Sequence, residues 1–272
     1  MNKYFLILLV IVFTFLGCSK NQDNSHFLSN DSHSYANFND VRISHLNLDL
    51  TVDFQQNILD GKVDISIKNY TNAKQLILDS KDLTIHKVLL EDSKETPFAL
   101  GDHSETFGQP LVVDIKPTTK MVSVYYTTSP DAEALQWLTP EQTLGKKHPF
   151  LFSQSQAILA RSWVPCQDGP GVKFTYDATI KTDSNLIALM SAENGTSKSD
   201  NGVYTFKMDQ PISSYLLALT VGDLEFASTG RNSGVYAEPA MLEKSVWELN
   251  TMQSMIDSAE QLYGPYAWDR YD

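Results

Sequence analysis

The sequence predicts a mainly β fold that gives way to a helix near its carboxyl end, and three observations support this prediction. Apolar and polar residues alternate strictly from Leu46 to Phe54, which is the period of a half-buried strand. Further short apolar runs follow, each bounded by turn-forming or charged residues. After Gly230 the apolar residues recur every three or four positions, as in a helix. A chain of 272 residues with 42% hydrophobic and 20% charged content is typical of one or two globular domains.

The amino-terminal segment has the features of a secretory signal. Lys3 provides a short positive region, and the apolar stretch after it is too short for a membrane-spanning helix, which needs roughly 20 residues. The stretch ends in Leu16-Gly17-Cys18, which is similar to the lipobox of bacterial lipoproteins. We therefore expect residues 1–18 to be a lipoprotein signal peptide and Cys18 to carry lipid that anchors an exported protein to a membrane of the bacterial cell envelope. An ordinary signal peptide with a coincidental cysteine is the alternative, and it also implies export.

The segment after the signal, the cysteine content and the overall charge give three further expectations. Residues 19–38 are rich in Ser, Asn and Asp and show no apolar period, which predicts a flexible tether. Cys166 is the one cysteine besides Cys18, so no structural disulfide is expected. The net charge of −12, without a cluster of Lys and Arg, argues against nucleic acid as a partner.

Period-two patterns predict an all-β domain over residues 39–229. The segment from Leu46 to Phe54 is expected to pair with residues 63–67 as a hairpin, with its turn around Asp60-Gly61. Proline and glycine residues between positions 128 and 150 predict a long loop. Further strands are expected at residues 76–78, 83–90, 111–115, 121–126, 174–180, 186–192, 204–208 and 215–224, the last buried on both faces.

Residues 230–272 are expected to begin a second domain. The apolar residues from Leu242 to Tyr263 form the stripe of one amphipathic helix, and Gly264-Pro265 ends it. No second helix follows in this chain, so we expect the remainder of the helical domain to lie outside it.

Residues for metal or nucleophilic catalysis are sparse. The six histidines are His26, His33, His45, His86, His103 and His148; none form an HExxH motif or a helical pair, so no zinc site is expected. There is no GxSxG motif, no phosphate-binding glycine loop and no local Cys–His pair. His45 is expected to be a solvated strand residue. Cys166 is expected to be a buried structural thiol and not a nucleophile, because no cation nearby in sequence would lower its pKa.

Gln154 and Gln156 are the candidate binding residues. If the stretch FSQSQ is extended, both side chains point to the same face. Two amides on one face suit the capture of a polar end group such as an ammonium. Two sheet-edge glutamines without a binding role are the alternative.

Four segments resemble the M1 family of zinc aminopeptidases, and in particular its leukotriene A4 hydrolase-like subfamily. They are LQWLTPEQT with GKKHPFLFSQSQAI, then VPCQDGPGVKFTY, SSYLLALTVGDLE and EKSVWELNTMQSMIDSAEQLYGPYAWDRYD, in family order. The resemblance implies a saddle-shaped, multi-sheet amino-terminal domain over residues 39–229. It also implies that residues 230–272 hold the first helix of a truncated, thermolysin-like zinc peptidase domain.

The resemblance further implies roles for the two glutamines. In the family, the residue matching Gln156 helps bind the free amino group of the substrate peptide, and the residue matching Gln154 lines the same pocket. Zinc activates the attacking water, and a helix glutamate acts as general base. The GxMEN and HExxH elements that carry this chemistry do not occur here. We therefore assign no catalytic or metal-binding residue and expect the chain alone to be inactive and to bind no zinc.

Two interpretations of function stay open. The first is the substrate-side portion of a zinc aminopeptidase that removes amino-terminal residues from peptides. The second is a lipid-anchored, non-catalytic β-rich binding module of the cell envelope, which the unpaired helix near Asp272 disfavours. A reading frame that continues past Asp272, directly or after a frameshift, into GxMEN and HExxH would support the first; a clean stop and unrelated sequence would support the second.

Overall fold

The computed structural model describes residues 28–272. The signal peptide, Cys18 and residues 19–27 of the predicted tether lie outside the described residues. The described part contains fifteen strands, two α-helices and three short 3-10 helices, so the prediction of a mainly β fold is confirmed. No helix within residues 28–272 is long and apolar enough to cross a membrane.

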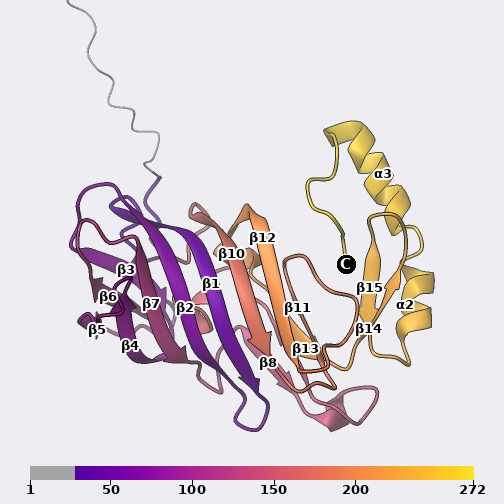
Figure 1. Cartoon of the computed structure of the whole chain (residues 1–272). Coiled ribbons are helices and arrows are strands. Elements are labelled where there is room, and N and C mark those ends of the chain that lie inside the picture. Colours follow the sequence, from indigo (N-terminus) through magenta and orange to yellow (C-terminus); the bar gives the residue numbers. More distant parts are fainter. Residues whose placement is uncertain (1–27) are drawn as a thin grey trace, which may run out of the picture.

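The largest sheet has six strands in the order β12-β10-β1-β2-β7-β4 (Figure 1). Its strands are β1 (Val41–Asp53), β2 (Ile58–Asn69), β4 (Thr84–Leu90), β7 (Met121–Thr127), β10 (Lys173–Lys181) and β12 (Val203–Ser213). Neighbouring strands are antiparallel except for β1 and β10, which run parallel. Leu46, Leu48 and Leu50 are fully buried, so the alternation in the sequence gives the core-facing side of β1 correctly.

The turn of the β1–β2 hairpin lies earlier in the chain than predicted. It spans residues 54–57, where Asp53 Oδ1 accepts hydrogen bonds of 2.8 and 3.0 Å from two backbone N–H groups. Gly61 lies inside β2 opposite Leu50, with a φ of 155°. A Cβ atom there would lie 2.0 Å from the carbonyl oxygen of Asp49. The glycine therefore permits a close backbone approach within the sheet and does not form the turn.

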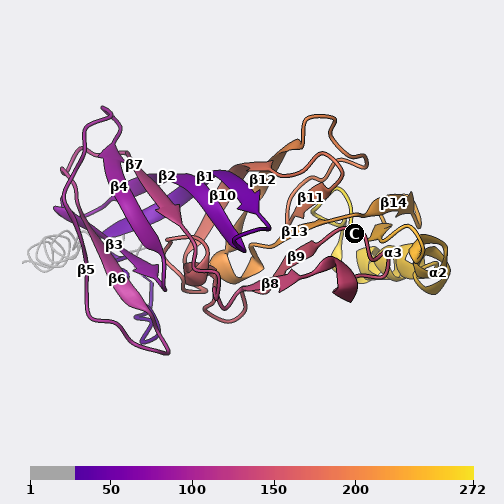
Figure 2. The same cartoon turned by 90° about the horizontal axis from the view of Figure 1, so that it is seen from below.

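Three smaller sheets complete the β structure, and Figure 2 shows that they follow one another along the molecule. The three-stranded sheet has the order β3-β6-β5, the four-stranded sheet β11-β13-β9-β8 and the two-stranded sheet β14-β15. Their strands are β3 (Gln75–Ser80), β5 (Phe98–Leu100), β6 (Gln109–Asp114), β8 (Leu135–Leu138), β9 (Phe150–Ser153), β11 (Ile187–Met190), β13 (Leu219–Gly222), β14 (Glu225–Ser228) and β15 (Gly234–Ala237). Buried side chains of the six-, three- and four-stranded sheets form one hydrophobic core.

Two segments, a predicted loop and a predicted strand, have a different secondary structure from the one expected. The long loop expected between residues 128 and 150 contains strand β8 and a 3-10 helix, Pro140–Gln142. The strand expected over residues 215–224 is shorter, because a 3-10 helix at Ser214–Leu216 precedes β13 and leaves Leu216 47% exposed. A serine hydroxyl bound to a buried carboxylate holds this bend, which an apolar run does not reveal.

The single predicted helix is divided into α2 (Leu242–Glu248) and α3 (Met252–Tyr263). The break contains Asn250 and Thr251, which disfavour a helix interior because their side chains compete for backbone hydrogen bonds. Both helices lie beside β14 and β15 at the end of the molecule away from β3 and β6 (Figure 1). Much of their apolar surface is open to solvent in this chain, including Trp247, which is 73% exposed.

Residues 28–38 pack against the β domain, in contrast to the flexible tether expected over residues 19–38. Ser34 donates its hydroxyl to Asp79 Oδ2 at 2.6 Å, and the backbone N–H of Tyr35 donates to Asp79 Oδ1 at 2.7 Å. The prediction is therefore wrong for this part of the segment. Its polar residues find partners on a buried carboxylate far away in sequence, which a local composition cannot show.

Candidate functional site

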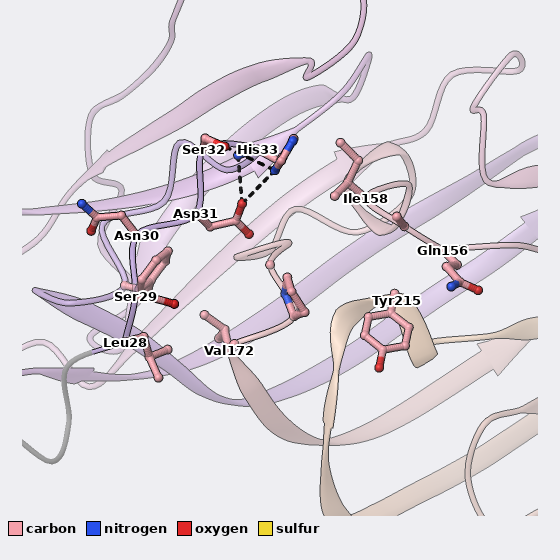
Figure 3. A pocket seen from close by; sticks show the side chains of 15 residues that line it. Leu28, Ser29, Asn30, Asp31, Ser32, His33, Gln156, Ile158, Val172 and Tyr215 are labelled. Carbon is pink, nitrogen blue, oxygen red and sulfur yellow. Dashed lines mark hydrogen bonds and ion pairs between the residues drawn. The ribbon is translucent and has the colours of Figure 1, made fainter.

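A pocket of about 620 Å³ lies where four segments from distant parts of the chain meet (Figure 3). One wall is the amino-terminal segment 28–33, and another is the turn at residues 156–158. The loop at residues 169–172 and Tyr215 close the other sides. Figure 3 shows Gln156 and Tyr215 toward one end, and Leu28, Ser29 and Asn30 toward the other.

The two candidate glutamines flank a buried serine just after β9. Ser155 points inward and donates its hydroxyl to the carbonyl oxygen of Leu217 at 2.7 Å. Gln154 and Gln156, on either side of it in the sequence, are both exposed. The hydroxyl of Ser155 also accepts a hydrogen bond from the indole N–H of Trp163 at 3.1 Å, which ties this turn to the core.

The pocket receives only one of the two glutamines. Gln156 lines it, whereas Gln154 is absent from the described lining residues. The side-chain oxygen of Gln154 instead accepts a hydrogen bond from the backbone N–H of Gln156 at 3.0 Å. Gln154 therefore supports the turn that carries Gln156, and the substrate-binding role of either residue stays a prediction.

A fully buried ion cluster of Arg161, Asp168 and Asp79 lies beneath the pocket. Arg161 follows the turn at residues 156–158 in a 3-10 helix, Ala160–Ser162. Its Nε donates to Asp168 Oδ2 at 3.0 Å, and its Nη1 lies 3.8 Å from Asp79 Oδ1. Burial raises the pKa of Asp168, while the hydroxyl of Ser214 and the guanidinium oppose that rise.

The ion cluster holds three of the four segments that line the pocket. Arg161 Nη2 donates to the carbonyl oxygen of His33 at 2.9 Å, which holds the amino-terminal segment. Asp168 directly precedes the loop at residues 169–172, and its Oδ1 accepts the hydroxyl hydrogen of Ser214, beside Tyr215, at 2.6 Å. Sequence reasoning missed this cluster, because a lone arginine and two aspartates give no local sign of burial.

Cys166 and His45, the other two residues considered from the sequence, lie outside the pocket lining. Cys166 is fully buried, and burial together with the carboxylates of Asp168 and Asp79 raises the pKa of its thiol well above the usual value. The prediction of a structural thiol is confirmed. His45 is partly exposed on β1, with Nδ1 2.7 Å from the hydroxyl of Thr175.

The described residues do not fit a zinc site. Within residues 28–272 no three His, Cys, Asp or Glu side chains are grouped so that they could hold a metal ion. The buried carboxylates of Asp79 and Asp168 are engaged by Arg161 and by serine hydroxyls.

Comparison with known proteins shows extensive similarity to one enzyme family. Residues 42–216 match the peptidase M1 N-terminal domain. The chain is 41% identical over 253 residues to leukotriene A-4 hydrolase of Xenopus laevis, covering 89% of this chain and 41% of that protein. It is 37% identical over 246 residues to leucine aminopeptidase 2 of Yarrowia lipolytica, covering 89% of this chain and 38% of that protein.

Solved structures give the same result. Native yeast LTA4 hydrolase matches with a TM-score of 0.83 and 32% identity over 90% of this chain and 39% of that one. This chain therefore spans about two fifths of the length of these relatives. Both the expected family and the expected multi-sheet β fold are confirmed. The chain belongs to the M1 peptidase family and carries the N-terminal domain of its leukotriene A4 hydrolase-like members.

Proposed function

We propose that this chain is the substrate-side portion of a zinc-dependent M1 aminopeptidase, in which Gln156 helps hold the free amino group of a peptide. The observation that carries the proposal is the match to the M1 N-terminal domain over residues 42–216, with 41% identity to a leukotriene A-4 hydrolase. Relatives from Yarrowia lipolytica and Sclerotinia sclerotiorum carry the name leucine aminopeptidase 2, which favours peptides as substrates.

The environment of Gln156 supports this role. Its side chain lines the pocket and is exposed, and no described residue hydrogen-bonds its side-chain amide. The amide oxygen is therefore free to accept a hydrogen bond from an ammonium group. Such a charge-assisted contact contributes roughly 1.5–3 kcal/mol.

The zinc dependence that the family resemblance implies has no counterpart in residues 28–272, which contain no suitable ligand group. We infer that the chain by itself has no aminopeptidase activity. A metal site would have to come from the roughly three fifths of the relatives' length that this chain does not span.

The arrangement of residues 230–272 supports the start of a second domain. Tyr271 forms a parallel bridge with Ser233 at the beginning of β15, and two backbone hydrogen bonds of 2.9 Å hold it there. Strand β15, helices α2 and α3, and Tyr271 thus have the connectivity of a β-α-β crossover. A crossover of this type is a folding unit distinct from the sheets of residues 41–222 that precede it.

The proposal can be tested in a chimera in which residues 28–272 replace the aligned portion of the Xenopus hydrolase. With leucine p-nitroanilide as substrate, Gln156→Ala should lower kcat/KM by roughly tenfold to a hundredfold, since ~1.4 kcal/mol corresponds to tenfold. Zinc content and Tm should be unchanged. Gln55→Ala, in the exposed β1–β2 turn, is the matched control and should leave kcat/KM unaltered.

Two outcomes would contradict the proposal. One is a folded, zinc-loaded chimera that does not hydrolyse the substrate. The other is a Gln156→Ala chimera whose kcat/KM matches that of the Gln55→Ala control, which would leave Gln156 a surface residue.

We further propose that Cys18 is the lipidated amino terminus of the mature protein and that the protein is anchored to a membrane of the cell envelope. The support is the short apolar run ending in Leu16-Gly17-Cys18. In cells, Cys18→Ser should move the protein from the membrane fraction to the soluble envelope fraction. A variant that stays in the membrane fraction would refute lipidation at this residue.

A further inference from the structure

The described chain joins the fold at one end of the β domain. The backbone N–H of Leu28 donates to Asn39 Oδ1 at 2.8 Å, and Asn39 Nδ2 donates to the carbonyl oxygen of Leu28 at 3.0 Å. Asn39 lies just before β1, so Leu28 is held where β1 begins and β2 ends (Figure 1). The chain that leads from Cys18 therefore reaches the β domain at this end.

Two further segments meet the start of β1. Residues 68–74 lie at the end of β2 and lead to β3, and residues 114–121 connect β6 to β7. Backbone hydrogen bonds of 2.8, 2.9 and 2.8 Å join these segments to one another and to the start of β1, from Tyr70 to Asp40, from Ile67 to Lys120 and from Ile115 to Lys74. We call residues 40–42, 68–74 and 114–121 the entry end.

The entry end is basic, although the whole chain carries a net charge of −12. It contains two acidic residues and five basic ones, which are Arg42, Lys68, Lys74, Lys116 and Lys120. All four lysines are exposed, and none of them forms a salt bridge with another residue in the described range 28–272. Arg42 lies over the ring of Tyr70 at 5.4 Å, and this tyrosine is 38% exposed. Tyrosine is enriched where proteins meet lipid head groups.

The acidic groups at and beside this surface do not reverse its charge. The adjoining turn at residues 91–95 holds three acidic residues and one lysine, so the turn and the entry end together have six basic and five acidic residues. Asp40 Oδ1 accepts the hydroxyl hydrogen of Thr71 at 2.9 Å, and Asp114 Oδ1 accepts a hydrogen bond from Gln75 at 3.3 Å. Glu91 Oε2 accepts the backbone N–H groups of residues 120 and 121 at 2.9 and 3.1 Å. The four lysines are thus available to an anionic partner.

Lipid on Cys18 would keep the entry end close to a membrane. Cys18 and Leu28 are ten residues apart, and a chain extends by at most about 3.6 Å per residue, which limits their separation to roughly 35 Å. A tether of this length makes docking of the attached domain an intramolecular step with a high effective concentration. Weak electrostatic contacts then suffice, since each lysine near an anionic membrane surface strengthens binding by about fivefold.

We propose that the entry end is a membrane-docking surface, whose lysines contact the anionic head groups of the bilayer that holds Cys18. The inference rests on the proposed lipidation of Cys18 and adds an orientation to it. The six-stranded sheet stands on the membrane at the end where β1 begins. The β1–β2 turn at residues 54–57 lies at the other end of this 13-residue strand, about 40 Å from the membrane surface, because a strand rises about 3.3 Å per residue.

The test uses the protein purified from cell membranes and reconstituted in vesicles of phosphatidylcholine with about 30% phosphatidylglycerol, an anionic lipid. A bimane label is attached at Thr118→Cys, in the exposed turn between Lys116 and Lys120, or at Gln55→Cys in the β1–β2 turn. Cys166 is fully buried and a lipidated Cys18 has no free thiol, so only the introduced cysteine is labelled. Lipids with a nitroxide on the head group should quench the label at residue 118 several times more strongly than the label at residue 55.

Three changes should abolish the difference in quenching between the two labels. One is the use of vesicles of phosphatidylcholine alone, and another is about 1 M salt, where the Debye length is about 3 Å. The third is the combination of Lys68→Gln, Lys74→Gln, Lys116→Gln and Lys120→Gln. The matched control combines four substitutions of exposed lysines outside the entry end, and its quenching should equal that of the unmodified chain: Lys87→Gln, Lys147→Gln, Lys181→Gln and Lys244→Gln.

The inference is overturned if the labels at residues 118 and 55 are quenched equally, or if the two sets of lysine substitutions have the same effect. Its failure is distinguishable from failure of the proposed lipidation, because the intact mass of the purified protein reports the acyl chains on Cys18. A mass without acyl chains refutes the lipid anchor. Acylated protein with equal quenching of the two labels refutes only the docking surface.

Discussion

Replacement of Arg161 by methionine should be among the most destabilising single changes in this protein. The guanidinium is fully buried and donates hydrogen bonds to the carboxylate of Asp168 and to the carbonyl oxygens of Phe107 and His33 at 3.0, 2.8 and 2.9 Å. Methionine fills much of the same volume but leaves the carboxylates of Asp168 and Asp79 buried without their cation. Loss of one partner of a buried ion pair costs about 3–5 kcal/mol.

The free energy of unfolding can be measured by urea titration with tryptophan fluorescence, because Trp163 is fully buried beside the ion cluster. Arg161→Lys keeps the charge but has a single head group that cannot reach all the acceptors, so its loss should be intermediate. Arg231→Met is the matched control. Arg231 is 66% exposed and pairs with Asp257 and Glu260 at 3.2 Å, so its loss should cost less than about 1 kcal/mol.

A free energy of unfolding for Arg161→Met within about 1 kcal/mol of the unmodified protein would refute this reasoning. That result would mean that water or a neighbouring group compensates the two carboxylates after the change. The cluster would then not be the element that holds the pocket walls together.

Three further predictions concern other parts of the molecule. Burial raises the pKa of the Cys166 thiol well above its usual value of 9.0. The unfolded chain therefore releases the thiol proton at a lower pH than the folded chain, and the free energy of unfolding falls as the pH rises above about 9. Urea titrations from about pH 8 to pH 10 should show about 1.4 kcal/mol more loss for the unmodified chain than for Cys166→Ala. Equal losses would contradict the burial argument. Gly61→Ala should destabilise the β1–β2 pairing by more than about 1 kcal/mol in the same assay, because its Cβ would meet the carbonyl oxygen of Asp49; an unchanged midpoint would show that the strands separate at little cost. Metal analysis of the purified chain after dialysis should find far less than one zinc per molecule, whereas a stoichiometric, tightly held zinc would contradict the absence of a ligand group in residues 28–272.

The alternation of apolar and polar residues correctly predicted strands that pack one face against the hydrophobic core. The alternation of Leu46, Leu48 and Leu50 identified β1 and its buried face, because a strand on a hydrophobic core needs only that pattern. Resemblance to the M1 family supplied the architecture that periodicity could not.

Features that depend on distant partners were not predictable in this way. The packing of residues 28–38 depends on Asp79, and the ordering of the loop after Asp168 depends on Arg161 and Ser214. These side chains have no pattern that distinguishes them from surface residues, since only the tertiary fold brings them together. The function of Gly61 was misjudged for a related reason, because glycine serves both turns and close strand contacts.

The parallel pairing of β1 with β10 has a consequence for how the chain reaches its folded state. His45 and Thr175 are partners in this pairing although they are 130 residues apart in the chain. The β1–β2 hairpin can form as soon as residue 69 is made, but one edge of β1 then has no neighbour. Contacts over such long separations slow folding, and an open strand edge is a site for pairing with other chains.

The end of β2 at residue 69 and the end of β10 at residue 181 are 112 residues apart, so synthesis at about 5–20 residues per second leaves that edge open for about 6 to 22 s. Strand β10 then pairs with the open edge of β1, and β12, which is made later, pairs with the other edge of β10 and completes this side of the largest sheet. The interval before it is the period in which a nascent chain of this protein is most exposed to aggregation, and in which a chaperone has most to protect.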